Sequence, residues 1–317
     1  METQKLQHFF KEFISPTCNR LQFIQDYLKA GGLDSSIMSM QGKNHIYVKF
    51  PKNQYNPMFK IKTVIAHYDR IGIGANDNSA AVFWLMEWAI SRMISATPVT
   101  TPTQVTTLTQ VATSAPVATS TQIAASSLAA TVTPVATSSS SPVATNSFHN
   151  IRLIFTDGEE LGETGGVEEQ GAFPLAKMFR KLGITNDDIY VFDCMGRGDV
   201  PILAQAKISP NVPTSFLTSY SQLEERTKKI LQSVSNGKWF TLPVNYSDNA
   251  SFIANGIPAV AITMLPSNEV QQVLKNEVPQ TWKDLHTEQD NFESLTPQAN
   301  EIFFKILNSL AQQKTLV

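Results

Sequence analysis

Histidines and carboxylates stand directly after several apolar runs of this sequence, at positions where they could act together. His67 follows the run TVIA, the pair Glu159 and Glu160 follows IRLIFTDG, and Asp193 follows DIYVF. Two adjacent glutamates at the end of a buried strand repel each other, because buried like charges must be paired or neutralised. A bound cation would explain the pair, and so would a solvated loop.

Two further positions add to this set. Asp77 lies in the turn GANDNS before an apolar helix, and His286 lies in the late acidic segment LHTEQD. Imidazole and carboxylate together are ligands that suit zinc, and two divalent ions would remove the repulsion. Asp69 shares a face of extended chain with His67 and could hold the far N–H of that imidazole. Each residue alone has an ordinary explanation, such as a helix N-cap for Asp77, but the whole set indicates a metal site.

The elements that must position these residues alternate between strands and helices. Short apolar runs rich in β-branched and aromatic residues predict buried parallel strands, and amphipathic or apolar stretches predict helices. Ligands collect at the carboxyl ends of strands in open α/β sheets, which would bring the set into one crevice. The pattern predicts an α/β sandwich with strands at 46–50, 63–69, 151–157, 188–194 and 256–264, and helices at 3–14, 19–30, 78–93, 172–182 and 296–312.

One segment, residues 96–147, differs in composition from the rest. It consists almost entirely of Ser, Thr, Ala, Val, Pro and Gln, without charge or aromatic residues, and loosely repeats PVATS. Such a stretch cannot bury enough apolar surface to offset the entropy of ordering, so it is predicted to be a disordered insertion. Residues 1–95 and 148–317 are therefore predicted to form a single interrupted domain. A glycosylated stalk or adhesive tract is the alternative reading of this segment and would require export.

Composition limits the partners and the compartment. The 317 residues carry a formal net charge of −2, which gives no electrostatic reason to expect nucleic acid or an acidic membrane surface as a partner. No apolar run is long enough to span a bilayer, and the N-terminal residues lack the order of a secretory signal. The two cysteines, Cys18 and Cys194, form no motif, so a cytoplasmic location is predicted. The sequence does not indicate an oligomeric state.

Five motifs in a fixed order give a specific resemblance. AHYD with GANDNSA, then FTDGEELG, VFDCMG, SDNASFIANGIPAV and LHTEQDN, together resemble the co-catalytic dizinc aminopeptidases, metallopeptidase family twenty-eight, which also includes glutaminyl cyclases. The similarity covers nearly the whole chain outside the insertion. It implies a three-layer αβα sandwich around a mixed, mostly parallel sheet.

The resemblance also implies a role for each residue of the set. It implies two zinc ions per chain, with His67 and Asp193 on the first, Glu160 and His286 on the second, and Asp77 bridging both. Glu159 would be the general base and later the general acid, and Asp69 would orient His67. Asp248 falls where the family has an acidic residue near the substrate.

The implied function is an exopeptidase of the aminopeptidase type that hydrolyses N-terminal peptide bonds of a peptide substrate. The choice among aminopeptidase, dipeptidase and carboxypeptidase stays open. A glutaminyl cyclase with one zinc is the alternative, although Leu285 stands where cyclases carry Trp and Asn78 follows Asp77 where cyclases have Ser-Ala. An inactive scaffold on the same fold is a further alternative. The acidic loop 163–169 is either a solvated loop or a wall of the substrate pocket.

Overall fold

The computed structural model describes residues 2–96, 148–245 and 247–317 of the chain. Residues Met1–Ala96 and Asn146–Val317 belong to one compact unit. Apart from Ala96, the predicted low-complexity insertion lies outside the described residues, and its disorder stays a prediction. The boundaries predicted for the interrupted domain likewise stay a prediction.

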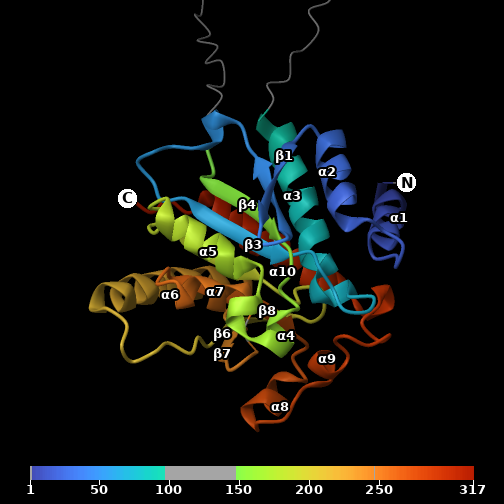
Figure 1. Ribbon diagram of the computed structural model, residues 1–317. Coiled ribbons are helices and arrows are strands. Elements are labelled where there is room, and N and C mark those ends of the chain that lie inside the picture. The colour runs from blue at the N-terminus through green and yellow to red at the C-terminus, as the bar shows by residue number, and fades with distance from the viewer. Residues whose placement is uncertain (1, 97–147, 246) are drawn as a thin grey trace, which may run out of the picture. The chain divides into compact units, whose positions relative to one another are not determined.

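An eight-stranded sheet forms the centre of the described unit (Figure 1). Its strand order is β1-β2-β4-β3-β5-β8-β6-β7. Strands β4, β3, β5 and β8 are parallel to one another, the pairs β1-β2, β2-β4 and β8-β6 are antiparallel, and the edge pair β6-β7 is parallel. The strands are β1 (Asp34–Met40), β2 (Lys43–Lys49), β3 (Lys62–His67), β4 (Ile151–Thr156), β5 (Asp188–Phe192), β6 (Val200–Ala204), β7 (Phe240–Leu242) and β8 (Ala259–Leu265).

Helices cover both faces of this sheet. The longer ones are α1 (Glu2–Phe13), α2 (Arg20–Ala30), α3 (Ala80–Ala96), α5 (Ala172–Lys181), α6 (Thr214–Val234), α7 (Asp248–Ala254) and α10 (Pro297–Gln312). Shorter ones are α4 (Gly162–Gly165), α8 (Val270–Leu274) and α9 (Gln280–Lys283), and single turns are η1 (Lys52–Gln54), η2 (Ala75–Ser79), η3 (Val167–Glu169) and η4 (Phe292–Ser294).

Successive side chains of the central strands point to opposite faces of the sheet, so the strands contribute to two separate cores. In β3, Val64 and Ala66 pack into a core shared with α2, α3, α6 and α10, whereas Ile65 packs into a second core with α5 and α7. Every residue of β3 and β5 is buried, as expected for parallel strands covered on both sides. The predicted αβα sandwich around a mixed, mostly parallel sheet is confirmed.

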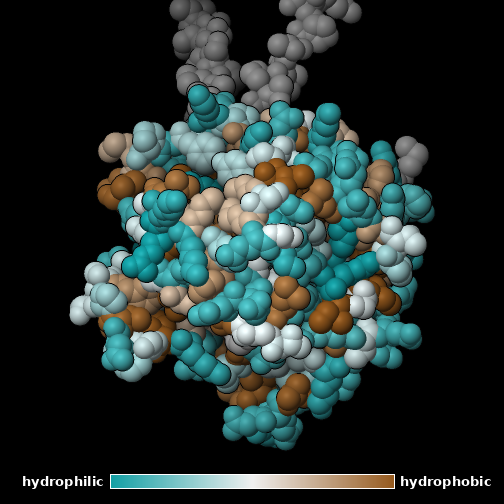
Figure 2. All heavy atoms as spheres, viewed as in Figure 1, coloured by the Kyte–Doolittle hydropathy of each residue, from teal (hydrophilic) through white to brown (hydrophobic). Residues whose placement is uncertain are grey.

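The outer surface is mostly polar on the face drawn in Figure 2. Hydrophilic side chains predominate there, and the apolar ones lie in small separate groups. In the part of the chain that the structure describes, no helix has both the length and the apolar character needed to cross a bilayer.

Candidate metal centre

Strand register brings the first predicted residues to one edge of the sheet. His67 is the last residue of β3 and pairs with Thr156, the last residue of β4. On the other side of β3, Ile65 pairs with Val191 of β5, so Asp193 follows at about the level of His67. The residues after β4 include Glu159 and Glu160. The carboxyl ends of three parallel strands therefore deliver these side chains to a common crevice, as ligand sites in such sheets require.

Asp77 reaches the same crevice from the turn η2 before α3. Gly74 precedes this turn in the left-handed region at φ +60°, and a Cβ atom there would lie 2.4 Å from the carbonyl oxygen of Asp77. The carboxylate of Asp290 accepts the backbone N–H groups of Asn76 at 2.6 Å and Asp77 at 3.1 Å. Glycine and Asp290 together fix where the side chain of Asp77 points.

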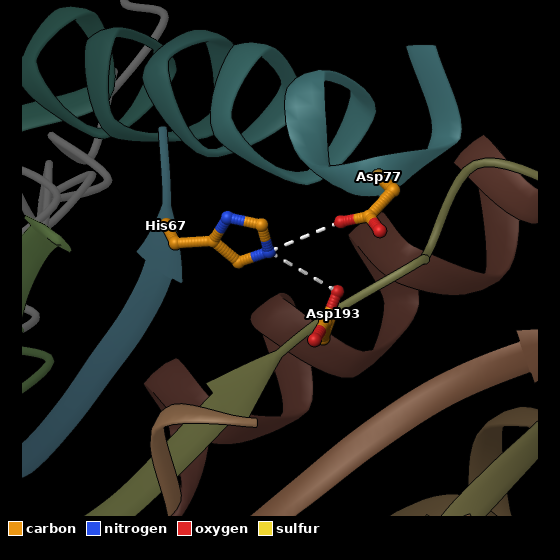
Figure 3. Close-up of side chains that lie close together, drawn as sticks. All are labelled: His67, Asp77 and Asp193. Carbon is orange, nitrogen blue, oxygen red and sulfur yellow. Dashed lines mark hydrogen bonds and ion pairs between the residues drawn. The ribbon is translucent and has the colours of Figure 1, made fainter. Parts of the chain in front are cut away.

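His67, Asp77 and Asp193 converge on one point (Figure 3). The Nε2 atom of His67 lies 3.2 Å from Oδ1 of Asp77 and 3.4 Å from Oδ1 of Asp193. On the other side of the ring, Nδ1 lies 3.5 Å from Oδ1 of Asp69, whose Oδ2 accepts the backbone N–H of Glu160. The imidazole is thus placed between one carboxylate behind it and two in front, and its exposed fraction is 1%.

A second cluster lies against the first. The Nε2 atom of His286 lies 3.3 Å from Oδ2 of Asp77 and 3.0 Å from Oε2 of Glu160. The two oxygens of Asp77 therefore face two different histidines. The potential ligand atoms of His67, Asp77 and Asp193, and separately those of Asp77, Glu160 and His286, all lie within 4.8 Å of one another.

These donor sets fit divalent cations. The Nε2 atom of His286 is buried between the carboxylates of Asp77 and Glu160, so the potential ligand atoms converge on a point between them. Each set combines one imidazole with two carboxylates, the ligand types that zinc accepts. The repulsion among the carboxylates is the remaining reason for a cation here.

The pKa shifts show how strongly this crevice favours positive charge. Hydrogen bonds to Asp77 and Glu160 raise the pKa of His286 to about 11. Burial lowers the pKa of His67, but Asp193, Asp69 and Asp77 outweigh burial and raise it well above its ordinary value. Burial raises the pKa of Glu159 well above the usual range, and the charge of His67 opposes that rise without cancelling it. The carboxylates of the crevice therefore favour positive charge next to them.

Glu159 faces the cavity and is held from behind. Its Oε1 atom accepts a hydrogen bond of 2.8 Å from Nε2 of Gln170, and Oε1 of Gln170 accepts one of 2.8 Å from the hydroxyl of Ser251. All three side chains are buried, with Gln170 at 1% and Ser251 at 0% exposure. These two hydrogen bonds engage only Oε1 of Glu159, which leaves Oε2 available to a molecule in the cavity.

A cavity of about 790 Å³ opens beside both clusters. Asp77, Glu159, Glu160, Asp193 and His286 line it, and its outer wall comes from strand ends and from the region of α8 and α9. That wall mixes apolar side chains, among them Val244, Ile262, Val273, Trp282 and Leu285, with polar ones, among them Lys207, Asn245, Thr263, Asn276 and Glu277. A molecule of the size of a short peptide terminus can enter it.

Asp248 lies outside this cavity wall. It is fully buried, and its Oδ2 atom accepts the hydroxyl of Thr156 at 2.5 Å, while its neighbour Ser247 lines the cavity. Burial raises the pKa of Asp248 to about 7. The substrate contact predicted for Asp248 has no support in this geometry, which instead ties Asp248 to the end of β4.

The structure brings together all the other predicted site residues and adds three that the sequence did not single out. Asp290 holds the turn of Asp77, Gln170 holds Glu159, and Glu163 lies 3.3 Å from Nδ1 of His286. Asp290 belongs to the late motif LHTEQDN, so its motif was visible in the sequence. Gln170 and Glu163 come from the loop after Glu160. Both alternatives for residues 163–169 apply in part, because Glu163 lines the cavity whereas Glu168 and Glu169 are exposed.

The sequence comparison identifies the family. The model of peptidase family M28 matches residues 123–311, more than half of the chain, and the chain belongs to this family as the resemblance predicted. No curated protein sequence matches the chain significantly.

Solved structures share the fold. LapA aminopeptidase from Legionella pneumophila is 13% identical with a TM-score of 0.59, covering 97% of this chain and 69% of that one. A Zn-dependent exopeptidase from Parabacteroides distasonis is 15% identical with a TM-score of 0.58, covering 97% and 98%. Glutaminyl cyclase from Macrostomum lignano is 15% identical with a TM-score of 0.53, covering 98% and 88%.

Proposed function

We propose that this chain is a zinc-dependent exopeptidase of the aminopeptidase type, acting on the N-terminal bond of a peptide. The observation that carries the proposal is Asp77, whose two oxygens lie 3.2 Å and 3.3 Å from the histidines of two adjoining clusters. A carboxylate between two donor sets is what a pair of metal ions requires. Membership of peptidase family M28 and the fold shared with aminopeptidases support the same reading.

The residues that would hold the ions follow from the two clusters. His67, Asp77 and Asp193 would hold one zinc, and Asp77, Glu160 and His286 the other. The chemistry that such ions supply is polarisation of the scissile carbonyl and acidification of a water molecule. Asp69 would keep the proton of His67 on Nδ1, so that Nε2 offers its lone pair to the metal.

Glu159 is the group placed to move protons. It lines the cavity together with residues of both clusters, it directly precedes Glu160 in sequence, and Gln170 fixes one of its oxygens. Its free oxygen would take a proton from the attacking water and later deliver it to the leaving amine. The apolar part of the cavity wall, which includes Ile262 and Trp282, would bind apolar parts of the substrate.

One experiment tests the proposal directly. Zinc-loaded protein is incubated in parallel with aminoacyl p-nitroanilides and with a peptide that begins with glutamine, each with a chelator control. Release of nitroaniline and of free amino acid, abolished by chelation and restored by zinc, is the expected result. Absence of hydrolysis in protein that holds two zinc ions would overturn the proposal.

The glutaminyl cyclase alternative has its own observation. Trp282, three residues before Leu285, lines the cavity, so an indole is present near the site although not directly before His286. A cyclase would convert the N-terminal glutamine to pyroglutamate in the same assay and release no amino acid. The complete His67 cluster, which a one-zinc cyclase does not need, favours the peptidase.

A further inference from the structure

The acidic loop after Glu160 places two carboxylates around one imidazole. Glu160 and Glu163 are three residues apart, and the backbone N–H of Glu163 points to the carbonyl of Glu160 at 3.4 Å. In such a turn, side chains at i and i+3 lie on the same face. Oε2 of Glu160 lies 3.0 Å from Nε2 of His286, and Oε2 of Glu163 lies 3.3 Å from Nδ1. Two carboxylates from one turn, those of Glu160 and Glu163, therefore lie next to the two ring nitrogens of His286.

The same arrangement surrounds His67. Its Nε2 atom faces Asp77 and Asp193, and its Nδ1 atom faces Asp69 at 3.5 Å. Glu163 stands to His286 as Asp69 stands to His67. A carboxylate behind a metal-binding imidazole fixes the tautomer and the direction of the ring.

His286 has more need of such a partner than His67 does. His67 is 1% exposed and is fixed at the end of a central strand, so packing alone restrains its ring. The side chain of His286 is 23% exposed and stands in a loop between α9 and η4, on a backbone in the left-handed region at φ +62°. Packing covers less of this ring than of the His67 ring, so a hydrogen bond has more to contribute to its orientation.

We propose that Glu163 is a positioning residue, which accepts a hydrogen bond from Nδ1 of His286 and so presents Nε2 to the second metal. The inference rests on the proposed function, because it gives His286 the role of a ligand. It assigns a purpose to the acidic loop, which otherwise looks like solvated surface. Glu163 acts on the metal through His286, and its side chain also forms part of the cavity lining.

The exposure of the Glu163 side chain determines how much its removal should weaken zinc binding. Removing such a partner typically costs 10–100-fold in metal affinity. The side chain of Glu163 is 51% exposed, and exposed charge pairs contribute little because water screens them. The expected loss is therefore about tenfold, at the lower end of that range.

The competing explanation is general attraction between a surface glutamate and any cation nearby. Glu168 provides the matched control, because it lies in the same loop, is exposed, and forms no ion pair with the described residues. Glu163→Ala and Glu168→Ala remove the same charge. Glu163→Gln keeps an oxygen that can accept the Nδ1 proton, so it separates hydrogen bonding from charge.

The test measures zinc binding rather than turnover. Stepwise zinc affinities of the wild type and the three variants are determined by competition with a chromogenic chelator, and folding is checked by circular dichroism. The ring nitrogens are followed by long-range ¹H–¹⁵N NMR, which is practical with five histidines in the chain. We expect Glu163→Ala to weaken one zinc about tenfold, Glu163→Gln to weaken it less, and Glu168→Ala to leave both unchanged.

Each other result decides against the proposal. Wild-type affinity in Glu163→Ala, or equal weakening in Glu168→Ala, overturns the positioning role while leaving the proposed function intact. A wild-type protein that binds no zinc overturns both together. Should Glu163→Ala fail to fold, Glu163→Leu against Glu168→Leu decides, because leucine has no acceptor for the Nδ1 proton, and equal affinities in that pair overturn the proposal.

Discussion

Gln170 donates a hydrogen bond of 2.8 Å to Oε1 of Glu159, and both side chains are buried. This bond fixes the rotamer of the carboxylate from the side away from the cavity. The restraint continues to Ser251, whose hydroxyl donates to Gln170. The proposed base is thus oriented by a loop and a helix that meet behind the site.

Replacing Gln170 by Leu should lower kcat by roughly tenfold, because general-base catalysis as a whole contributes about 10²–10⁴-fold and the carboxylate would still be present. KM and zinc content should change little. Steady-state kinetics on an aminoacyl p-nitroanilide measures both parameters. Ser251→Ala removes only the more distant hydrogen bond, so it serves as a control and should lower kcat less. An unchanged kcat in Gln170→Leu would show that Gln170 does not orient Glu159.

Replacing Glu159 by Gln should reduce turnover by about 10²–10⁴-fold, since an amide cannot accept the proton of the attacking water. Zinc binding should persist, because the ligand atoms belong to other residues. Single-turnover assays and elemental analysis on the same sample give the two readouts. Wild-type turnover in this variant would assign the proton transfer to another group.

Removing metal should destabilise the protein as well as inactivate it. Without cations, the carboxylates around His67 and His286 repel one another, and ligand binding to the native state stabilises it by about 2.7 kcal/mol at a hundredfold excess over Kd. Calorimetry should show a lower Tm in the apo protein, restored by zinc. Binding saturating at two zinc ions per chain is expected, and saturation at one would favour the cyclase alternative.

His149 should make folding stability depend on pH away from the site. It is 3% exposed, Nδ1 accepts the N–H of Ile151, and Phe50 packs edge-on against its ring. Burial, reinforced by the charges of Lys62, Arg92 and Lys314, lowers the pKa of His149 to about 3.

The unfolded chain has a histidine pKa of about 6.5, so it binds the proton first as pH falls. The contribution of His149 is therefore complete above pH 6.5 and is lost progressively toward pH 3, at about 1.4 kcal/mol per pH unit. Urea unfolding of wild type and His149→Asn between pH 7 and 5 checks this. The asparagine keeps an acceptor but cannot titrate, so the free energy of unfolding of the variant should depend less steeply on pH. Equal slopes in the two proteins would show that His149 is not the source of the pH dependence.

The strands nearest the site were predictable because their signal is strong. The runs TVIAH and DIYVF are covered on both faces, so apolar residues predominate in them, and their ends were located within two residues. The edge strand β1 has no buried residue in its burial pattern, and β7 has three residues, so neither carries a clear hydrophobic period. In β6 a proline, Pro201, argues against a strand in sequence.

The residues of the site likewise fall into those that the sequence could predict and those that it could not. The residues at strand ends were found because their position follows from the sheet alone, and Asp77 because it opens a helix beside it. Glu163 and Gln170 could not be found, since their contacts depend on how a glycine-containing loop returns behind Glu159. The burial of Asp248 was also beyond sequence reasoning, because an aspartate before a helix is usually exposed.

His286 stands on a left-handed backbone, a conformation that costs an ordinary residue roughly 1–2 kcal/mol and costs glycine almost nothing. Backbone conformation alone would favour glycine at this position. The histidine therefore marks a trade-off between backbone strain and metal binding: His286→Gly would relieve the strain but would also remove a metal ligand and the ion pairs with Asp77 and Glu160. Substitutions meant to increase the thermal stability of this protein should therefore be sought elsewhere in the chain.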